Sequence, residues 1–186
     1  MKWHLAAAEL TVQGYAEDVF RVLPEATRDP SVEIAVTHVH RPSHTSALPV
    51  VMLHGEFSNR SQWYRQEEEC LARDLLEQHC EVWLPEMPGH GLSPPNRAYC
   101  RNSLRDHVGT DLPAVQEFVT SCAGRPALWV GCGLGALALL AAIEAGGLQR
   151  GQIRGLVLVG LDDVSTLWRR AAASPCKTVS ASLSPK

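Results

Sequence analysis

The sequence lacks the features that mark several large classes of protein. It has no long run of Lys and Arg residues and its net charge is −3, so nothing predicts the basic surface that binds nucleic acid. No apolar stretch reaches the roughly 18 residues that a membrane span requires. The apolar run at residues 5–8 is too short for a secretory signal peptide. We therefore expect no nucleic-acid partner, no membrane span and a cytoplasmic location.

Paired cysteines are also missing from the sequence. The six cysteines lie far apart and none forms a C-x-x-C pair, the spacing common in zinc sites. We predict free thiols in a reducing compartment, no metal site and no other cofactor. The cysteines are Cys70, Cys80, Cys100, Cys122, Cys132 and Cys176.

The chain has enough apolar material for one domain or a large piece of one. It has 186 residues, of which 45% are hydrophobic and 20% charged. Residues 1–31 form an N-terminal segment that we expect to supply the first strand of the domain. Residues 32–163 carry the regular patterns of a partial domain. Residues 164–186 are mostly small and polar, and we predict a disordered tail there.

Short apolar runs alternate with helical patterns along the middle of the chain. Residues 32–39 alternate as in a half-buried strand. The runs at 49–53, 80–84, 127–130 and 153–159 are typical of strands buried on both faces of a parallel sheet. Helices are predicted at 62–79, at 104–119 and at 136–145. Pro113 predicts a kink, or a new helix that Asp111 could cap. This alternation predicts an α/β fold with a mostly parallel sheet and flanking helices.

Three of the predicted strand ends carry residues suited to a site, because open α/β sheets bind ligands at the carboxyl ends of their strands. These ends are His54-Gly55, the loop 89–93 and Gly131-Cys132-Gly133-Leu134-Gly135. The last one lies between a strand and a helix with the spacing of the G-x-S-x-G nucleophile elbow. It predicts a sharp turn that presents its central residue above the sheet.

With these motifs in order, the chain resembles the α/β-hydrolase superfamily, and most closely its lipase and esterase branches. The matching segments are residues 50–55, 82–96, 111–114 and 129–136, within a resemblance that spans residues 32–162. It implies an α/β-hydrolase-like sheet truncated after about the sixth strand of the family fold. It also implies hydrolysis of carboxylic or lipid esters, and a small ester or lipid-like ligand. The oxyanion-hole region implied by the resemblance is His54, Gly55, Glu56 and Leu134.

Two departures from the family pattern concern the catalytic residues. Gly133 stands at the nucleophile position, and glycine has no atom that can attack a carbonyl. Cys132, one position earlier, is the alternative nucleophile, although we expect its side chain to point away from the elbow tip. None of the eight histidines follows Gly133, so the C-terminal histidine of the family is missing. Asp162 or Asp163 could lie near an acid position or cap a helix.

Three functions therefore compete. The chain is predicted to be an α/β-hydrolase-like protein whose catalysis is impaired. Alternatively it is an active esterase or lipase-like enzyme that uses Cys132 or residues of a partner chain. It could also be a non-enzymatic interaction or scaffold protein that self-associates through the edge strand 153–159. We expect His54 to shape the oxyanion loop and His90 to stabilise its own loop.

Overall fold

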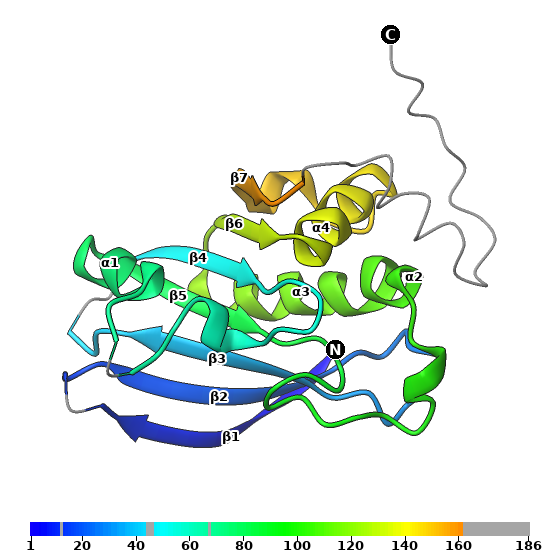
Figure 1. The fold of residues 1–186 in the computed structure, drawn as a ribbon, viewed down its shortest axis with the longest axis horizontal. Coiled ribbons are helices and arrows are strands. Elements are labelled where there is room, and N and C mark those ends of the chain that lie inside the picture. Colours follow the sequence, from blue (N-terminus) through cyan, green and yellow to red (C-terminus); the bar gives the residue numbers. More distant parts are fainter. Residues whose placement is uncertain (12, 44–46, 67, 162–186) are drawn as a thin grey trace, which may run out of the picture.

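Seven strands form one sheet in the order β1-β2-β3-β5-β4-β6-β7 (Figure 1). The computed structural model describes residues 1–11, 13–43, 47–66 and 68–161. Strands β2, β5, β4, β6 and β7 run in one direction, and β1 and β3 run in the other. The predicted mostly parallel sheet is therefore confirmed. The strands are β1 Lys2–Leu10, β2 Ala16–Leu23, β3 Ile34–His40, β4 Leu48–Leu53, β5 Cys80–Pro85, β6 Ala127–Cys132 and β7 Ile153–Val159.

The N-terminal segment contains two strands, where the sequence predicted one. Strands β1 and β2 pair as an antiparallel hairpin, and β2 then pairs with β3. Every residue of β1 is exposed, so this strand lacks the buried alternation by which a strand is recognised in a sequence. The ring of Trp3 nevertheless packs edge-on against Phe118, with 5.4 Å between ring centroids.

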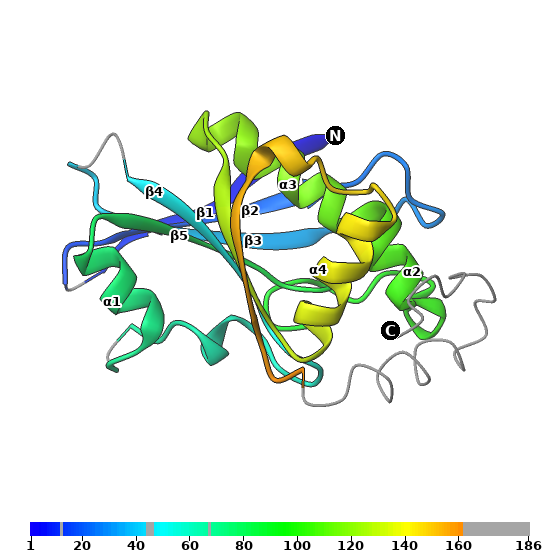
Figure 2. The same cartoon turned by 90° about the horizontal axis from the view of Figure 1, so that it is seen from above.

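Helices cover both faces of the sheet, with α1 on one side and α3 and α4 on the other (Figure 2). Strand β4 shows why its sequence is wholly apolar. Val51 and Leu53 belong to the core beneath α3 and α4, whereas Val50 and Met52 belong to the core beneath α1. The helices are α1 Leu71–Glu77, α2 Leu104–Asp106, α3 Leu112–Ala123 and α4 Leu134–Glu144.

The helix predicted at 62–79 is much shorter in the structure. A 3-10 turn occupies Arg60–Gln62 and α1 begins only at Leu71. Between them the side chains of Trp63 and Tyr64 are buried in the core beneath α1. The backbone also folds back, so that the Ala72 N–H donates to the Trp63 carbonyl at 3.2 Å. Burial of these two rings therefore outweighs the helical pattern of the sequence.

The predicted interruption near Pro113 is confirmed. A π-helical turn, His107–Asp111, separates α2 from α3, and Pro113 lies in the first turn of α3. Asp111 does not cap α3, because its carboxylate accepts a hydrogen bond from His107 instead.

Strand β7 is less buried than its apolar sequence predicts. The side chains of Val157 and Val159 are 44% and 46% exposed. Within the described part of the chain, β7 pairs only with β6. A strand with one neighbour at the margin of a sheet leaves part of its apolar surface open. The tail predicted at 164–186 lies outside the described residues.

Candidate functional site

The turn between β6 and α4 has the backbone of an elbow. Gly133 joins the two elements with φ 51° and ψ −114°, a backbone conformation that residues with a side chain rarely adopt. Its N–H donates to the carbonyl of Val159 at 2.9 Å, and its own carbonyl accepts from the N–H of Leu137 at 3.0 Å. The turn is therefore fixed on both sides, by β7 and by the first turn of α4.

The three glycines of the elbow have different surroundings. A Cβ on Gly131 would lie 2.7 Å from the Cα of Ala136, and one on Gly135 would lie 2.5 Å from the carbonyl oxygen of His54. Neither position has room for a side chain. A Cβ on Gly133 would meet only the Cα of Gly55, at 3.9 Å. Sterically, the central position is the one of the three that can hold a side chain, and it holds none.

The loop after β4 lies against the elbow. His54 is buried, and its Nε2 accepts a hydrogen bond from the Met87 N–H at 3.1 Å. Its Nδ1 lies 2.8 Å from the carbonyl oxygen of Gly55, which can only accept, so Nδ1 carries the proton. Burial lowers the pKa of His54 to about 4. The imidazole is therefore neutral at neutral pH and has both nitrogens engaged, which suits it to holding the loop.

The backbone donors that the family pattern assigns to an oxyanion hole are Glu56 and Leu134. Leu134 is the first residue of α4, so its N–H has no acceptor within the helix and points from the positive end of the helix dipole. Glu56 follows Gly55, whose own N–H is held by the side-chain oxygen of Gln62 at 2.9 Å. Gln62, a residue that the sequence analysis did not single out, thus fixes the loop that presents Glu56.

Cys132 lies on the far side of β6 from α4. Its side chain packs at the margin of the core beneath α1, whereas Gly131 faces the Leu139 side chain of α4. A Cβ on Gly160 would lie 3.8 Å from the Cys132 sulfur. The thiol is half-buried between the ends of β6 and β7 and not at the elbow tip.

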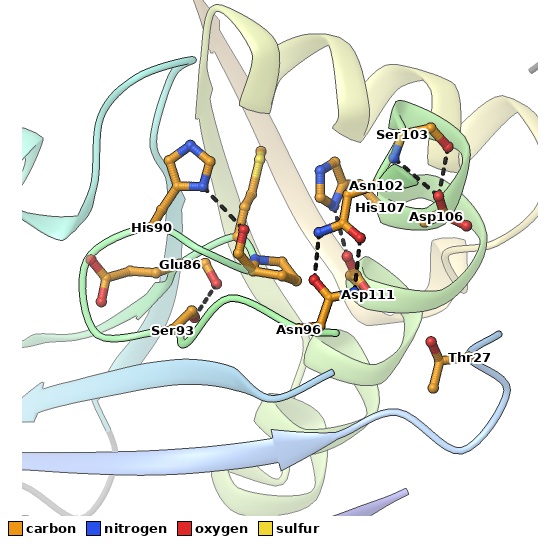
Figure 3. A network of polar contacts seen from close by, with 12 residues as sticks. Thr27, Glu86, His90, Ser93, Asn96, Asn102, Ser103, Asp106, His107 and Asp111 are labelled. Atoms are coloured by element: carbon orange, nitrogen blue, oxygen red, sulfur yellow. Dashed lines mark hydrogen bonds and ion pairs between the residues drawn. The ribbon is translucent and has the colours of Figure 1, made fainter. Parts of the chain in front are cut away.

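A polar network holds the loop that follows β5 (Figure 3). The buried carboxylate of Glu86 accepts from the backbone N–H groups of Arg60 and Leu92 at 3.0 and 2.9 Å. The hydroxyl of Ser93 donates to the Glu86 carbonyl at 2.6 Å and accepts from the N–H of Ala35 at 2.8 Å. This network ties the 86–96 loop to β3 and to the turn before α1.

Two further histidines lie in the electrostatic neighbourhood of His54. The rings of His90 and His54 are 5.1 Å apart, and His90 Nδ1 lies 3.3 Å from the Pro88 carbonyl of its own loop. His107 is buried in the π-helical turn, with Nδ1 2.7 Å from a carboxylate oxygen of Asp111 (Figure 3). The i, i+4 spacing of this pair was the signal that the sequence offered for it. Positive charge on His90 or His107 lowers the pKa of His54.

Other predicted positions contribute nothing to this geometry. Asp162 and Asp163 lie outside the described residues. In the described ranges, one group of side chains could hold a metal ion, and it consists of Asp18, His38 and His40. This group lies on β2 and β3, apart from the elbow.

No helix among the described residues is long and apolar enough to cross a bilayer.

Comparison with known proteins gives the family. The model of the alpha/beta hydrolase family matches residues 50–181, and the chain belongs to that family. No curated protein sequence matches it.

Solved structures share the fold at low identity. A cold-adapted esterase from an Arctic intertidal metagenomic library has 18% identity and a TM-score of 0.60, over 85% of this chain and 65% of that one. A thermophilic esterase from Thermogutta terrifontis has 19% identity and a TM-score of 0.56, over 75% and 44%. An epoxide hydrolase from Vigna radiata has 15% identity and a TM-score of 0.55, over 80% and 41%. The chain thus spans 41–65% of the length of these structures.

The steric difference between the elbow glycines predicts different costs for adding one methyl group. Gly135→Ala should lower the free energy of unfolding by on the order of 3 kcal/mol or more, because backbone must move. Gly133→Ala should cost less, about 1–3 kcal/mol, because the strained backbone at φ 51° and ψ −114° is its only penalty. Urea unfolding measures both. Gly151→Ala is the matched control, since nothing lies within 4 Å of a Cβ at that position. Equal losses of unfolding free energy in Gly133→Ala and Gly135→Ala would contradict the steric difference between the two positions.

The buried neutral state of His54 predicts acid sensitivity. Between its ordinary pKa of 6.5 and its folded pKa of about 4, only the unfolded chain takes up the proton. The free energy of unfolding should therefore fall as the pH is lowered through this window, by about 3 kcal/mol from this group. Urea unfolding at pH 7.0 and near pH 4.5 should show a smaller loss for His54→Gln than for the unmodified chain. Equal losses would count against the buried neutral imidazole.

Proposed function

We propose that this protein binds a small ester or lipid-like ligand at the elbow and does not hydrolyse it through an acyl-enzyme. The observation that carries the proposal is Gly133, which keeps the backbone of a nucleophile elbow and has space for a side chain that is absent. Acyl transfer requires an attacking oxygen or sulfur at this position.

The second supporting argument concerns the general base, because neither His54 nor His107 is placed to act as one at the elbow. His54 cannot serve, because it donates through Nδ1 and accepts through Nε2 and its pKa is lowered to about 4. His107 is oriented by Asp111 but is buried in the π-helical turn. A general base must reach the proton that it removes.

The surroundings of the elbow favour an uncharged ligand with a polar carbonyl. The start of α4 offers the N–H of Leu134 to a carbonyl oxygen. Phe57, directly after the His-Gly loop, is 91% exposed and has a φ of 58°. An exposed aromatic ring held in a costly backbone conformation beside a site is available to an apolar group. Esterases among the structural neighbours support the same ligand class.

Hydrolysis of a short-chain nitrophenyl ester tests the proposal. The unmodified chain and Gly133→Ala should release nitrophenol no faster than buffer, because neither has a nucleophile at the elbow. Gly133→Ser restores the hydroxyl without a base, and its rate should stay within about tenfold of the same background. Binding of a non-hydrolysed analogue, followed by saturation-transfer NMR, should be present in all three proteins and weaker in Phe57→Ala.

Turnover by the unmodified chain that disappears in Cys132→Ala would overturn the proposal and establish the alternative enzyme that uses Cys132. A thiol-reactive ester provides an independent control. Exposed Cys100 should be labelled before half-buried Cys132 in the folded protein.

The second candidate function is an interaction or scaffold role through β7. The observation that favours it is the exposed Val157 and Val159 on a strand whose described pairing is with β6 alone. Such an edge can pair with another chain. Val157→Lys should then shift the mass measured by light scattering toward the monomer. A monomeric unmodified chain at high concentration would exclude self-association.

A further inference from the structure

A second cluster of chemically active side chains lies away from the elbow, on β2, β3 and β5. Asp18, His38 and His40 each offer one ligand atom, and these atoms lie within 4.8 Å of one another. Glu81 adds a second carboxylate, since its oxygen lies 3.1 Å from Nε2 of His38. All four side chains are partly buried, with exposures of 12–25%.

Strand geometry explains why these residues meet. His38 and His40 are two positions apart on β3, so both point to the same face of the sheet. Asp18 of β2 is the register partner of His38 and therefore lies on that face. One of its carboxylate oxygens lies 3.2 Å from Nε2 of His40. The cluster thus depends on the pairing of strands and not on a flexible loop.

Stacked rings hold the two imidazoles in place. The His38 ring lies parallel to the indole of Trp83, with centroids 3.7 Å apart. The His40 ring stacks on the other side of His38 at 4.3 Å and an interplanar angle of 16°. Nearly parallel rings do not aim their nitrogens at one point, so one ring must turn to share a ligand. His40, the more exposed of the two, has the freedom to do so.

The ligand chemistry selects the type of ion. Two imidazoles and a carboxylate suit Zn²⁺, Ni²⁺ or Cu²⁺, whereas Ca²⁺ and Mg²⁺ prefer oxygen ligands. We propose that Asp18, His38 and His40 form a site for a divalent transition-metal ion, with Glu81 beside it. The absence of C-x-x-C pairs led the sequence analysis to predict no metal. The H-x-H pattern of β3 indicates a metal site only when β2 pairs with β3 and places Asp18 beside the two histidines.

The position of the cluster separates it from ester chemistry. Strand β3 runs opposite to β5, so its last residues lie beside the start of β5 and β4. The elbow lies at the other end of the parallel strands, after β6. An ion bound at the cluster would join β2 to β3 and stabilise the N-terminal half of the sheet, because it binds only the folded chain.

Titration with NiCl₂ by calorimetry tests the proposal on the full chain. The unmodified protein should contain one site that binds Ni²⁺ at least about tenfold more tightly than His40→Gln or Asp18→Asn does. Asp18→Asn is nearly isosteric and removes only the charge. His4→Gln, on exposed β1, is the matched control and should bind as the unmodified protein does. Because His38 stacks on Trp83, Ni²⁺ should also quench part of the tryptophan fluorescence, and less in His40→Gln.

Thermal unfolding of each variant without metal verifies that it folds. ZnCl₂ should then raise the melting temperature of the unmodified chain and of His4→Gln, but not that of His40→Gln or Asp18→Asn. Equal Ni²⁺ affinity in folded unmodified protein and folded His40→Gln would overturn the proposal. Failure of the unmodified chain to bind Ni²⁺ would do the same. Neither result bears on ester binding at the elbow.

Discussion

The close approach of α4 to the end of β4 is the constraint on which the candidate site depends. A Cβ on Gly135 would lie 2.5 Å from the carbonyl oxygen of His54, so the first turn of α4 can reach this loop only with glycine there. The same approach brings the Cα of Gly55 to 3.9 Å from the Cβ position of residue 133. The His-Gly loop, the elbow and the start of α4 are thereby packed as one unit, whatever residue occupies position 133.

The chemistry of the elbow and its stability are separable for this reason. Close packing requires glycine at positions 131 and 135. It does not require glycine at position 133, because little lies near the Cβ position there. A residue with φ 51° carries strain unless it is glycine. Glycine at this position therefore keeps the turn without strain. The fold of the elbow therefore does not depend on a side chain at position 133.

The sequence predicted those parts of the fold that bury apolar residues on both faces. The runs that became β4 and β6 are unambiguous because a strand under two helical layers has no polar side. The helix expected at 62–79 failed because Trp63 and Tyr64 bury their rings through a turn, which periodicity cannot reveal. Residues 1–31 supply two strands where one was expected, because exposed β1 has no buried alternation to separate it from β2. The sequence pattern thus predicts a strand correctly where both of its faces are buried. It fails where tertiary contacts determine the local structure.

The residues of the candidate site show the same difference between local sequence patterns and tertiary contacts. Gly133 could be identified from the sequence because the elbow is a contiguous motif. The neutral state of His54 could not, since it depends on the Met87 N–H, 33 residues later in the chain. Both nitrogens of that imidazole are occupied by backbone groups, so it fixes the geometry of the loop and has no lone pair for a substrate proton. A histidine beside an elbow is therefore not evidence of catalysis until the hydrogen bonds of its two nitrogens are known. In His54 both hydrogen bonds hold the loop in place.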